Sequence, residues 1–259
     1  MRRSSPRGHP GAGPLANAWI VALVILVVVV IVLLSRAGGG RRALVPSGWQ
    51  RGMNFTSITA AGFATRQAQA SLGALRATGT DHVSFVPTWY MASPTANAVA
   101  PDPAKTPTDA SVLTGMRDAH ALGLTVTLKP HVDVANGSFR GQVRPADPLA
   151  WFVSYHAMID HYAALAADGG ARTLVVGDEL ASQSGRTADW RALITEVRRR
   201  FAGMLTYGAN WVDEAEHVGF WDALDTINVD GYMPLSRKGT LDQNVLRLWY
   251  GTASDPAIR

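Results

Sequence analysis

Short apolar runs alternate with amphipathic stretches between residues 52 and 250, and this alternation limits the possible folds more than any other feature of the sequence. The runs are bounded by turn residues, which is typical of buried strands. The stretches between them repeat apolar residues with helical spacing. Strict alternation predicts a parallel sheet with helical crossovers. The predicted strands are 52–58, 82–91, 125–134, 173–180, 203–211 and 226–235, and the predicted helices are 64–77, 109–122, 148–167 capped by Asp147, a segment capped by Thr187, and 241–250.

Two architectures fit such a pattern, an open doubly wound sheet and a closed barrel. No Gly-x-Gly-x-x-Gly or phosphate-loop motif follows any predicted strand, which argues against the nucleotide-binding open sheets. Polar or aromatic residues instead mark the carboxyl end of every strand, as in the active sites of barrels. We therefore predict an α/β fold of the (β/α)8 TIM-barrel type with about six of its eight units present. The strand-end residues are Asn54, Trp89, His131, Asp133, Glu179, Asn210, Trp211 and Tyr232.

The candidate for acid–base chemistry is Glu179, which follows the apolar run Leu174–Val176 and a Gly-Asp pair. A carboxyl group at the end of a buried strand is desolvated, so its pKa rises, which suits a general acid. A structural interpretation also fits the residues. Asp178 or Ser182 would then cap the next helix, with Glu179 in its first turn.

Lys129, His131 and Asp133 alternate along one predicted strand, so their side chains point the same way. They are expected to line a polar pocket that binds a sugar or orients a carboxylate. A satisfied polar network is the structural alternative, and a lone His-x-Asp pair is a weak metal signal. Trp89, Tyr90 and Trp211 suit stacking on the apolar faces of sugar rings, although each also fits ordinary packing.

The net charge of +4 comes from the N-terminal region. Residues 1–51 contain seven arginines and no acidic residue, which leaves 17 basic against 20 acidic residues in the rest of the chain. A nucleic-acid-binding domain needs its basic residues on the folded part, so nucleic acid is not an expected partner. The sequence has no cysteine, which excludes disulfides and cysteine-based metal sites.

The N-terminal region divides by composition. Residues 1–14 are predicted to form a disordered basic tail, 15–35 a transmembrane helix or signal anchor, 36–47 a linker, and 48–259 the barrel domain. The stretch 15–34 is free of charge, and Trp19 suits a membrane interface. Ser35-Arg36-Ala37 resembles a cleavage site, so a secreted protein with a removed signal peptide is the alternative. We expect a membrane-anchored protein with its folded domain outside the cytoplasm.

Several ordered motifs together resemble glycoside hydrolase family 113. They are Gly52-Met-Asn-Phe, Leu128-Lys-Pro-His-Val-Asp133, Trp151-Phe, Val176-Gly-Asp-Glu-Leu180, Trp190-Arg, Leu205-Thr-Tyr-Gly-Ala-Asn-Trp211, Phe220-Trp-Asp and Val229-Asp-Gly-Tyr-Met-Pro-Leu235. Known members of that family include retaining endo-β-1,4-mannanases with a (β/α)8 barrel. The resemblance implies a mannan-like polysaccharide substrate, Glu179 as the acid/base and no metal or organic cofactor. Asn54, Lys129, His131, Asn210 and Tyr232 would orient the sugar or the carboxylates.

The sequence departs from this family in one respect that concerns the chemistry. The family nucleophile is a glutamate at the end of the seventh strand, whereas no glutamate follows Glu216 here. Retaining hydrolysis needs two carboxyl groups about 5–5.5 Å apart. A fragment of a longer product, a degenerate relative that only binds, or another acid such as Asp230 would each explain this. We expect the chain alone to be inactive, and a membrane-anchored, non-catalytic carbohydrate-binding protein is the alternative function.

Overall fold

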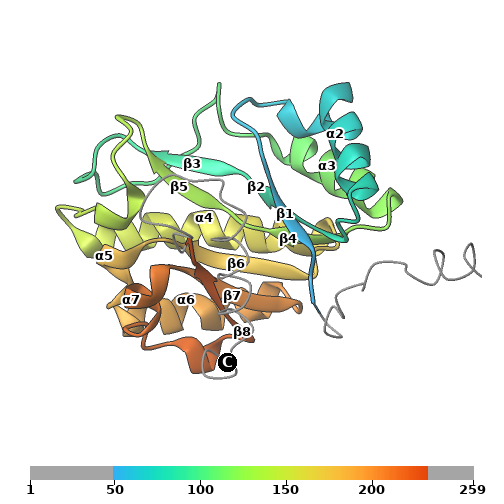
Figure 1. The fold of residues 1–259 in the computed structure, drawn as a ribbon. Coiled ribbons are helices and arrows are strands. Elements are labelled where there is room, and N and C mark those ends of the chain that lie inside the picture. Colours follow the sequence, from blue (N-terminus) through green and yellow to red (C-terminus); the bar gives the residue numbers. More distant parts are fainter. Residues whose placement is uncertain (1–48, 233–259) are drawn as a thin grey trace, which may run out of the picture. The chain divides into compact units, whose positions relative to one another are not determined.

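A computed structural model describes residues 49–232, and Figure 1 shows its elements. Six parallel strands form the main sheet in the order β1-β2-β4-β6-β7-β8, so neighbours in the sheet follow one another along the chain. This is the order expected for six consecutive strands of the predicted barrel. Their bounds are β1 (Gly52–Thr56), β2 (His82–Val86), β4 (Thr125–Leu128), β6 (Thr173–Asp178), β7 (Met204–Asn210) and β8 (Thr226–Asp230).

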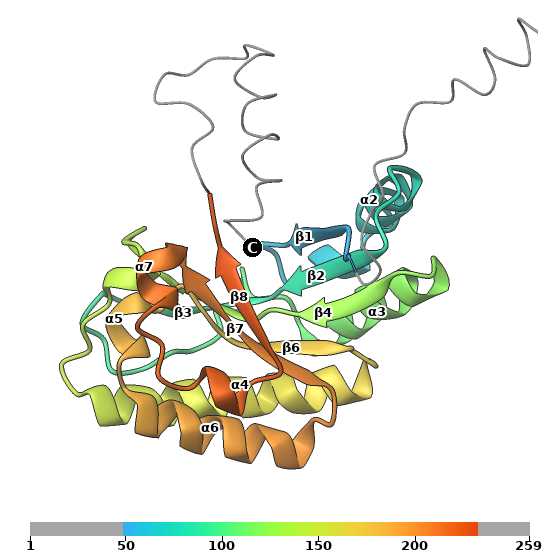
Figure 2. The same cartoon turned by 60° about the horizontal axis from the view of Figure 1, so that its bottom comes forward.

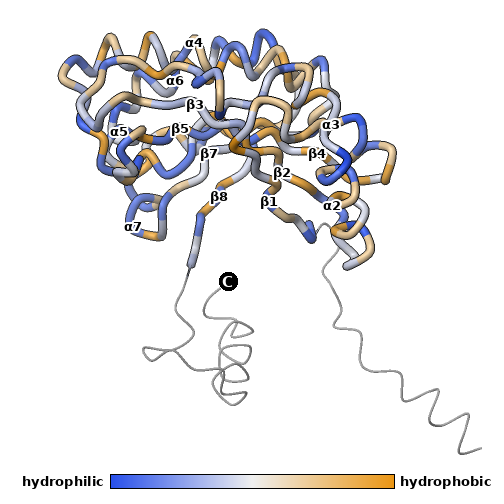
Figure 3. The backbone as a smooth tube through the Cα atoms, turned by 90° about the horizontal axis from the view of Figure 1, so that it is seen from above, coloured by the Kyte–Doolittle hydropathy of each residue, from blue (hydrophilic) through white to orange (hydrophobic). Residues whose placement is uncertain are grey.

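Helices cover the outer face of this sheet, and β1 and β8 form its two edges in the described part of the chain (Figures 2 and 3). The long helices are α2 (Arg66–Ala77), α3 (Asp109–Ala121), α4 (Pro148–Asp168) and α6 (Thr187–Arg200). Shorter helical turns are η1 (Gly62–Ala64), η2 (Arg140–Gln142), α5 (Ala181–Ser184), α7 (Trp211–Ala215) and η3 (Trp221–Ala223).

Two of the predicted strands each divide in two at a proline. Pro87 separates β2 from β3 (Thr88–Met91), and Pro130 separates β4 from β5 (His131–Val134). Proline has no N–H group to donate to a neighbouring strand, so the ladder breaks at both positions. Beyond the prolines β3 and β5 pair with each other as a two-stranded parallel sheet, and an isolated antiparallel bridge joins Tyr90 of β3 to Ala100. The single strands predicted over 82–91 and 125–134 are therefore wrong in this detail.

Helix starts were predicted with mixed success. Asp147 caps α4 as predicted, because its carboxylate accepts hydrogen bonds from the N–H groups of Leu149 and Ala150. Thr187 does not cap α6, since it is already the first helical residue and Arg186 holds the cap position. The predicted helix 241–250 and the predicted membrane segment 15–35 lie outside the described residues. Within residues 49–232, the helices are all too short or too polar to cross a membrane.

Aromatic side chains fill the core behind the central strands. Trp190 of α6 stacks on Phe220 with ring centroids 5.3 Å apart, and it meets the edge of Tyr207 of β7 at 5.1 Å. Gly177 on β6 faces this cluster, where an added Cβ would lie 2.6 Å from the Trp190 ring and 2.7 Å from the Tyr207 ring. Only glycine allows β6 to approach these rings so closely. This packing therefore fixes the backbone of β6 at Gly177, directly before Asp178 and Glu179.

Candidate active site

The carboxyl ends of three strands bring four ionisable side chains together. Lys129 follows β4, Asp178 and Glu179 end β6, and Asp230 ends β8. Because parallel strands end at the same edge of a sheet, residues far apart in the sequence meet there. Carboxylate oxygens of the three acids all lie within 4.8 Å of one another. This edge is where a barrel carries its active site.

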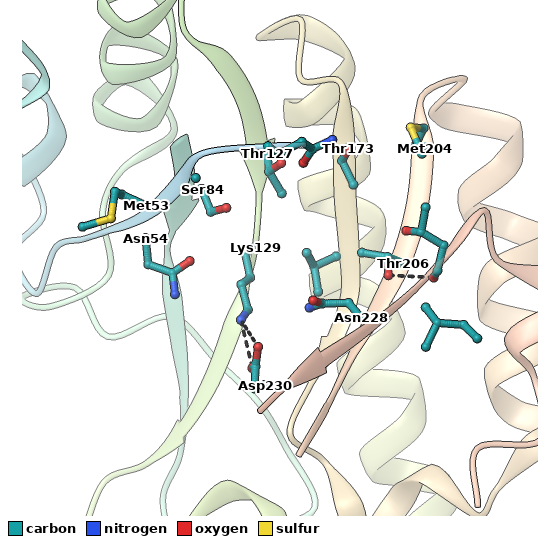
Figure 4. Close-up of a pocket in the computed structure, with 15 residues that line it drawn as sticks. Met53, Asn54, Ser84, Thr127, Lys129, Thr173, Met204, Thr206, Asn228 and Asp230 are labelled. Atoms are coloured by element: carbon teal, nitrogen blue, oxygen red, sulfur yellow. Dashed lines mark hydrogen bonds and ion pairs between the residues drawn. The ribbon is translucent and has the colours of Figure 1, made fainter. Parts of the chain in front are cut away.

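Lys129 lies at the centre of the cluster and is only 6% exposed. Its Nζ is 2.8 Å from Asp178 Oδ1 and 3.1 Å from Asp230 Oδ2, and Figure 4 shows the pair with Asp230. Burial alone would lower the pKa of Lys129, but the negative charges of Asp178 and Asp230 outweigh it and raise that pKa. Lys129 therefore stays charged and ties the end of β4 to the ends of β6 and β8.

Asp178 has surroundings at this edge that favour its ionised form. Its side chain is buried, which favours the neutral acid, but His131 Nε2 lies 2.8 Å from Oδ2 and Lys129 lies beside Oδ1. These two partners hold the pKa of Asp178 well below its usual range. Glu179 is thus next to a fixed negative charge.

The pKa of Glu179 is shifted in the opposite direction from that of Asp178. Burial, followed by the negative charge of Asp178, raises the pKa of Glu179, although the nearby Arg140 guanidinium opposes the rise. Arg140 Nη1 lies 3.1 Å from Glu179 Oε2. This is the direction predicted from the sequence for a general acid. Two neighbouring carboxyl groups with pKa values moved apart are the arrangement that separates a proton donor from a fixed charge.

Arg140 was not identified from the sequence. It lies in η2, and its guanidinium donates to the carboxylates of Asp133 and Glu179 and to the carbonyl of Val132. A loop arginine 39 residues before Glu179 carries no sequence signal for this contact. Asp133, which was predicted to be in the site, is held in place by this arginine.

Two hollows adjoin the cluster. The first, of about 470 Å³, is on the inner face of the sheet and is lined largely by small polar residues (Figure 4). The second, of about 460 Å³, is beside Glu179. Lining residues of the first include Asn54, Ser84, Thr127, Lys129, Asn228 and Asp230, and lining residues of the second include Tyr90, Lys105, Asp133, Arg140 and Glu179.

Comparison with known proteins decides the family. The profile of Glycoside Hydrolase Family 113 matches residues 53–250. The chain belongs to glycoside hydrolase family 113. A family 113 β-mannanase from Alicyclobacillus acidocaldarius, solved in complex with ManMIm, is 33% identical, with a TM-score of 0.70 over 80% of this chain and 67% of that one. A second family 113 β-1,4-mannanase, also solved as a complex, is 28% identical, with a TM-score of 0.69 over 80% of this chain and 69% of that one. A search of curated proteins gives no match.

Three of the predicted site residues of this family 113 chain surround the buried ion pairs. Lys129, His131 and Asp133 all contact the charged cluster or its arginine. Asn54 lines the first hollow from β1. Tyr232 is 76% exposed and is the last described residue.

Trp89 lines neither hollow beside the charged cluster. Its ring packs on α4, with centroids 5.8 Å from His161 and 6.1 Å from Tyr162. Side chains alternate along a strand, so the next residue, Tyr90, faces the second hollow instead. Lys105 lies over the Tyr90 ring, 5.1 Å from its centroid.

Asn210 and Trp211 line a separate depression together with Ser184 and His217. Glu214 lies in the short helix α7 and is only 6% exposed. Glu214 accepts hydrogen bonds from the Tyr207 hydroxyl and the Asn210 N–H group. The sequence of this acidic segment gives no indication that one of its carboxyl groups is buried against a strand.

Proposed function

We propose that the protein is a glycoside hydrolase that acts on β-1,4-linked mannan, with Glu179 as its general acid/base. The observation that carries this proposal is the position of Glu179 directly after β6, in contact with Arg140 and next to Asp178, which Lys129 and His131 bind. Burial and the charge of Asp178 raise the pKa of Glu179 there. Membership in family 113 and the likeness to two β-mannanases support the substrate class.

In the proposed reaction Glu179 donates its proton to the glycosidic oxygen while the bond from that oxygen to C1 breaks. In the second half-reaction the Glu179 carboxylate takes a proton from the water that attacks C1. Asp178 is held ionised by Lys129 and His131, so it does not compete with Glu179 as a proton donor. Arg140 binds one oxygen of Glu179, which leaves the other to meet the substrate.

A retaining mechanism also needs a nucleophilic carboxylate, and we propose that it is not among the glutamates of this sequence. Besides Glu179 the sequence has only three, and none is near the cluster as a free side chain. Glu196 lies on α6, Glu214 is buried in hydrogen bonds, and Glu216 is exposed in its loop. The chain then performs the acid/base step but does not form the glycosyl-enzyme by itself.

Rescue by an external anion tests both parts of the proposal. The full 259-residue chain is incubated with mannohexaose, whose leaving sugar hydroxyl needs a proton, with and without sodium azide. Azide attacks C1 as the bond to the leaving oxygen breaks, and Glu179 gives its proton to that oxygen. The expected result is a shorter manno-oligosaccharide and an α-glycosyl azide only when azide is present, with the α configuration fixed by a single inversion.

Control variants separate the alternatives. Glu179→Gln should abolish the azide-dependent product, whereas Glu216→Gln, an exposed neighbour of the same residue type, should leave it unchanged. Turnover without azide would refute the proposal that the chain lacks its nucleophilic carboxylate. Binding of mannohexaose in calorimetry with no product under any condition would refute the enzyme and favour the non-catalytic carbohydrate-binding protein.

We also propose that residues 15–35 anchor the domain in a membrane with the barrel outside the cytoplasm. The support is the uncharged stretch 15–34, which has the length that a bilayer core requires. Extraction of cell membranes with alkaline carbonate tests the anchor. A chain that stays in the pellet supports it, and a shortened chain in the medium supports signal cleavage instead.

A further inference from the structure

Two residues at neighbouring strand ends adopt a backbone conformation that side chains disfavour. Glu179 has φ 53° and Trp211 has φ 67°, and they are the two non-glycine residues with positive φ in the described part of the chain. Such conformations persist only where the surroundings hold them in place, and they concentrate at functional sites. The contacts that hold Glu179 come from β7.

Two hydrogen bonds fix the peptide groups around Glu179. Its own N–H group donates to the carbonyl of Gly208 at 2.7 Å. The next N–H group, that of Leu180, donates to the hydroxyl oxygen of Tyr207 at 3.0 Å. The first bond needs only the backbone of β7, whereas the second depends on where one side-chain hydroxyl is held.

Glu214 holds that hydroxyl. The Tyr207 hydroxyl donates to Glu214 Oε1 at 2.6 Å, so its lone pairs are turned toward Leu180. The other carboxylate oxygen, Oε2, accepts the N–H group of Asn210, the residue before the strained Trp211. One buried carboxylate therefore binds Tyr207, which contacts the residue after Glu179, and Asn210, which directly precedes Trp211.

We infer that Glu214 is a positioning residue that acts through Tyr207 to hold the backbone of Glu179 in its left-handed conformation. The consequence for turnover rests on the proposed acid/base role of Glu179. The geometry itself does not, because Glu214 contacts neither hollow beside the charged cluster.

A carboxylate suits this position for a chemical reason. Tyr207 and Asn210 each present a donor, so two acceptor oxygens are needed in one plane. An ionised carboxylate offers both, whereas a glutamine offers one acceptor and would oppose a donor with its own amide. Burial raises the pKa of Glu214, and the hydrogen bonds from Tyr207 and Asn210 act against that rise.

The charged groups around the two glutamates belong to different elements. Glu179 faces Arg140 of η2, Asp178 of its own strand, Asp230 of β8 and Lys129 after β4. Glu214 faces Tyr207, and the charge of Asp178 also acts on it. A change at Glu214 that left the backbone in place would therefore leave the near neighbours of Glu179 unaltered.

Titration of Glu179 by carbon NMR tests the inference directly. The sequence has only four glutamates, Glu179, Glu196, Glu214 and Glu216, so labelling glutamate with 13C at Cδ gives four carboxyl signals from the full chain. The Glu179→Gln variant assigns the signal. The test variants are Tyr207→Phe, which keeps the ring and removes the hydroxyl, and Glu214→Gln, with Glu216→Gln as the exposed control.

In both test variants the backbone at Glu179 should relax and its carboxyl group should move toward solvent. Burial and the charge of Asp178 then act on it less, so its titration midpoint should fall by about half a unit or more. Glu216→Gln should leave the midpoint unchanged. A purely structural role would lower the melting temperature and leave the Glu179 midpoint where it was.

An unchanged midpoint in folded Tyr207→Phe overturns the inference, even if Glu214→Gln does not fold. Azide rescue is a separate measurement. If Glu179→Gln retains rescue while Tyr207→Phe shifts the midpoint, the acid/base proposal is wrong and the positioning role stands.

Discussion

Replacing Lys129 by methionine should expose how much the buried ion pairs contribute to the fold. Methionine keeps most of the length of the lysine side chain and removes its charge. Asp178 and Asp230 then lose a partner that is 2.8 Å from one and 3.1 Å from the other. Asp178 retains His131 and Arg140 nearby, but Lys129 is the one cation that contacts Asp230 in the described part of the chain.

The expected loss of stability depends on the fact that Asp178 keeps other cationic partners whereas Asp230 keeps none among the described residues. Removing one partner of a buried ion pair typically costs about 3–5 kcal/mol, because a buried charge is left uncompensated. Asp178 is still compensated and the Asp230 side chain is 17% exposed, so we expect the lower end, about 3 kcal/mol. For a domain of this size about 2–4 °C corresponds to 1 kcal/mol, so the melting temperature should fall by about 6–12 °C.

Thermal unfolding of the full chain, followed by tryptophan fluorescence at neutral pH, measures this effect. The matched control is Lys105→Met, which removes a lysine whose side chain is 51% exposed and 3.6 Å from Asp102. An exposed pair of this kind contributes about 0–1 kcal/mol, so the control should melt within about 4 °C of the wild type.

A second substitution shows whether the loss of stability in Lys129→Met comes from the uncompensated carboxylate of Asp230. Adding Asp230→Asn to Lys129→Met removes the uncompensated carboxylate, and the double variant should melt at a higher temperature than Lys129→Met alone. The reasoning is refuted if Lys129→Met melts like the Lys105→Met control. It is also refuted if the double variant is destabilised by the sum of its two single changes.

Two further predictions concern the same edge of the sheet. Gly208→Ala adds a Cβ against Asp178 Oδ1 and so displaces that carboxylate from Lys129. The free energy of unfolding measured by calorimetry should fall by about 1–3 kcal/mol. Unchanged stability would show that the added Cβ does not displace Asp178. Stability should also depend on pH with two opposite slopes. The raised pKa values of Glu179 and Asp230 mean that stability is lost as pH rises through them, so it should increase on acidification from pH 7. The depressed pKa of Asp178 contributes stability above its unfolded value of about 3.9, and that contribution should disappear below it. A monotonic decline in melting temperature from pH 7 downward would contradict this account.

The sequence predicts those parts of the structure that local pattern controls. The alternation of apolar runs and amphipathic stretches gives the six strands of the main sheet and their order, and Asp147 before Pro148 gives the start of α4. Glu179 could be placed at a strand end because an apolar run leads directly into it.

Long-range contacts escaped the same reasoning. Arg140 reaches Glu179 from a loop, and Glu214 is buried by its hydrogen bond to a tyrosine seven residues away on another element. The sequence did not distinguish Trp89, which packs on α4, from Tyr90, which faces the second hollow, because an apolar run that is buried on both sides does not reveal which side chain faces the cavity. In each case the missing information is three-dimensional packing, which a short window of sequence does not contain.

The two prolines that interrupt the strands separate residues that must pack in the barrel wall from residues that line the hollow beside Glu179. Pro87 and Pro130 detach the β3–β5 pair from the main sheet, so its residues are not constrained by closure of the barrel wall. This small sheet nevertheless carries Tyr90 and Asp133 into the hollow beside Glu179. Under the proposed function, substitutions in this small sheet alter which ligand is recognised and leave the strands of the main sheet and Glu179 in place. Within this lineage, selectivity should diverge faster on the β3–β5 pair than at the strand ends of the main sheet.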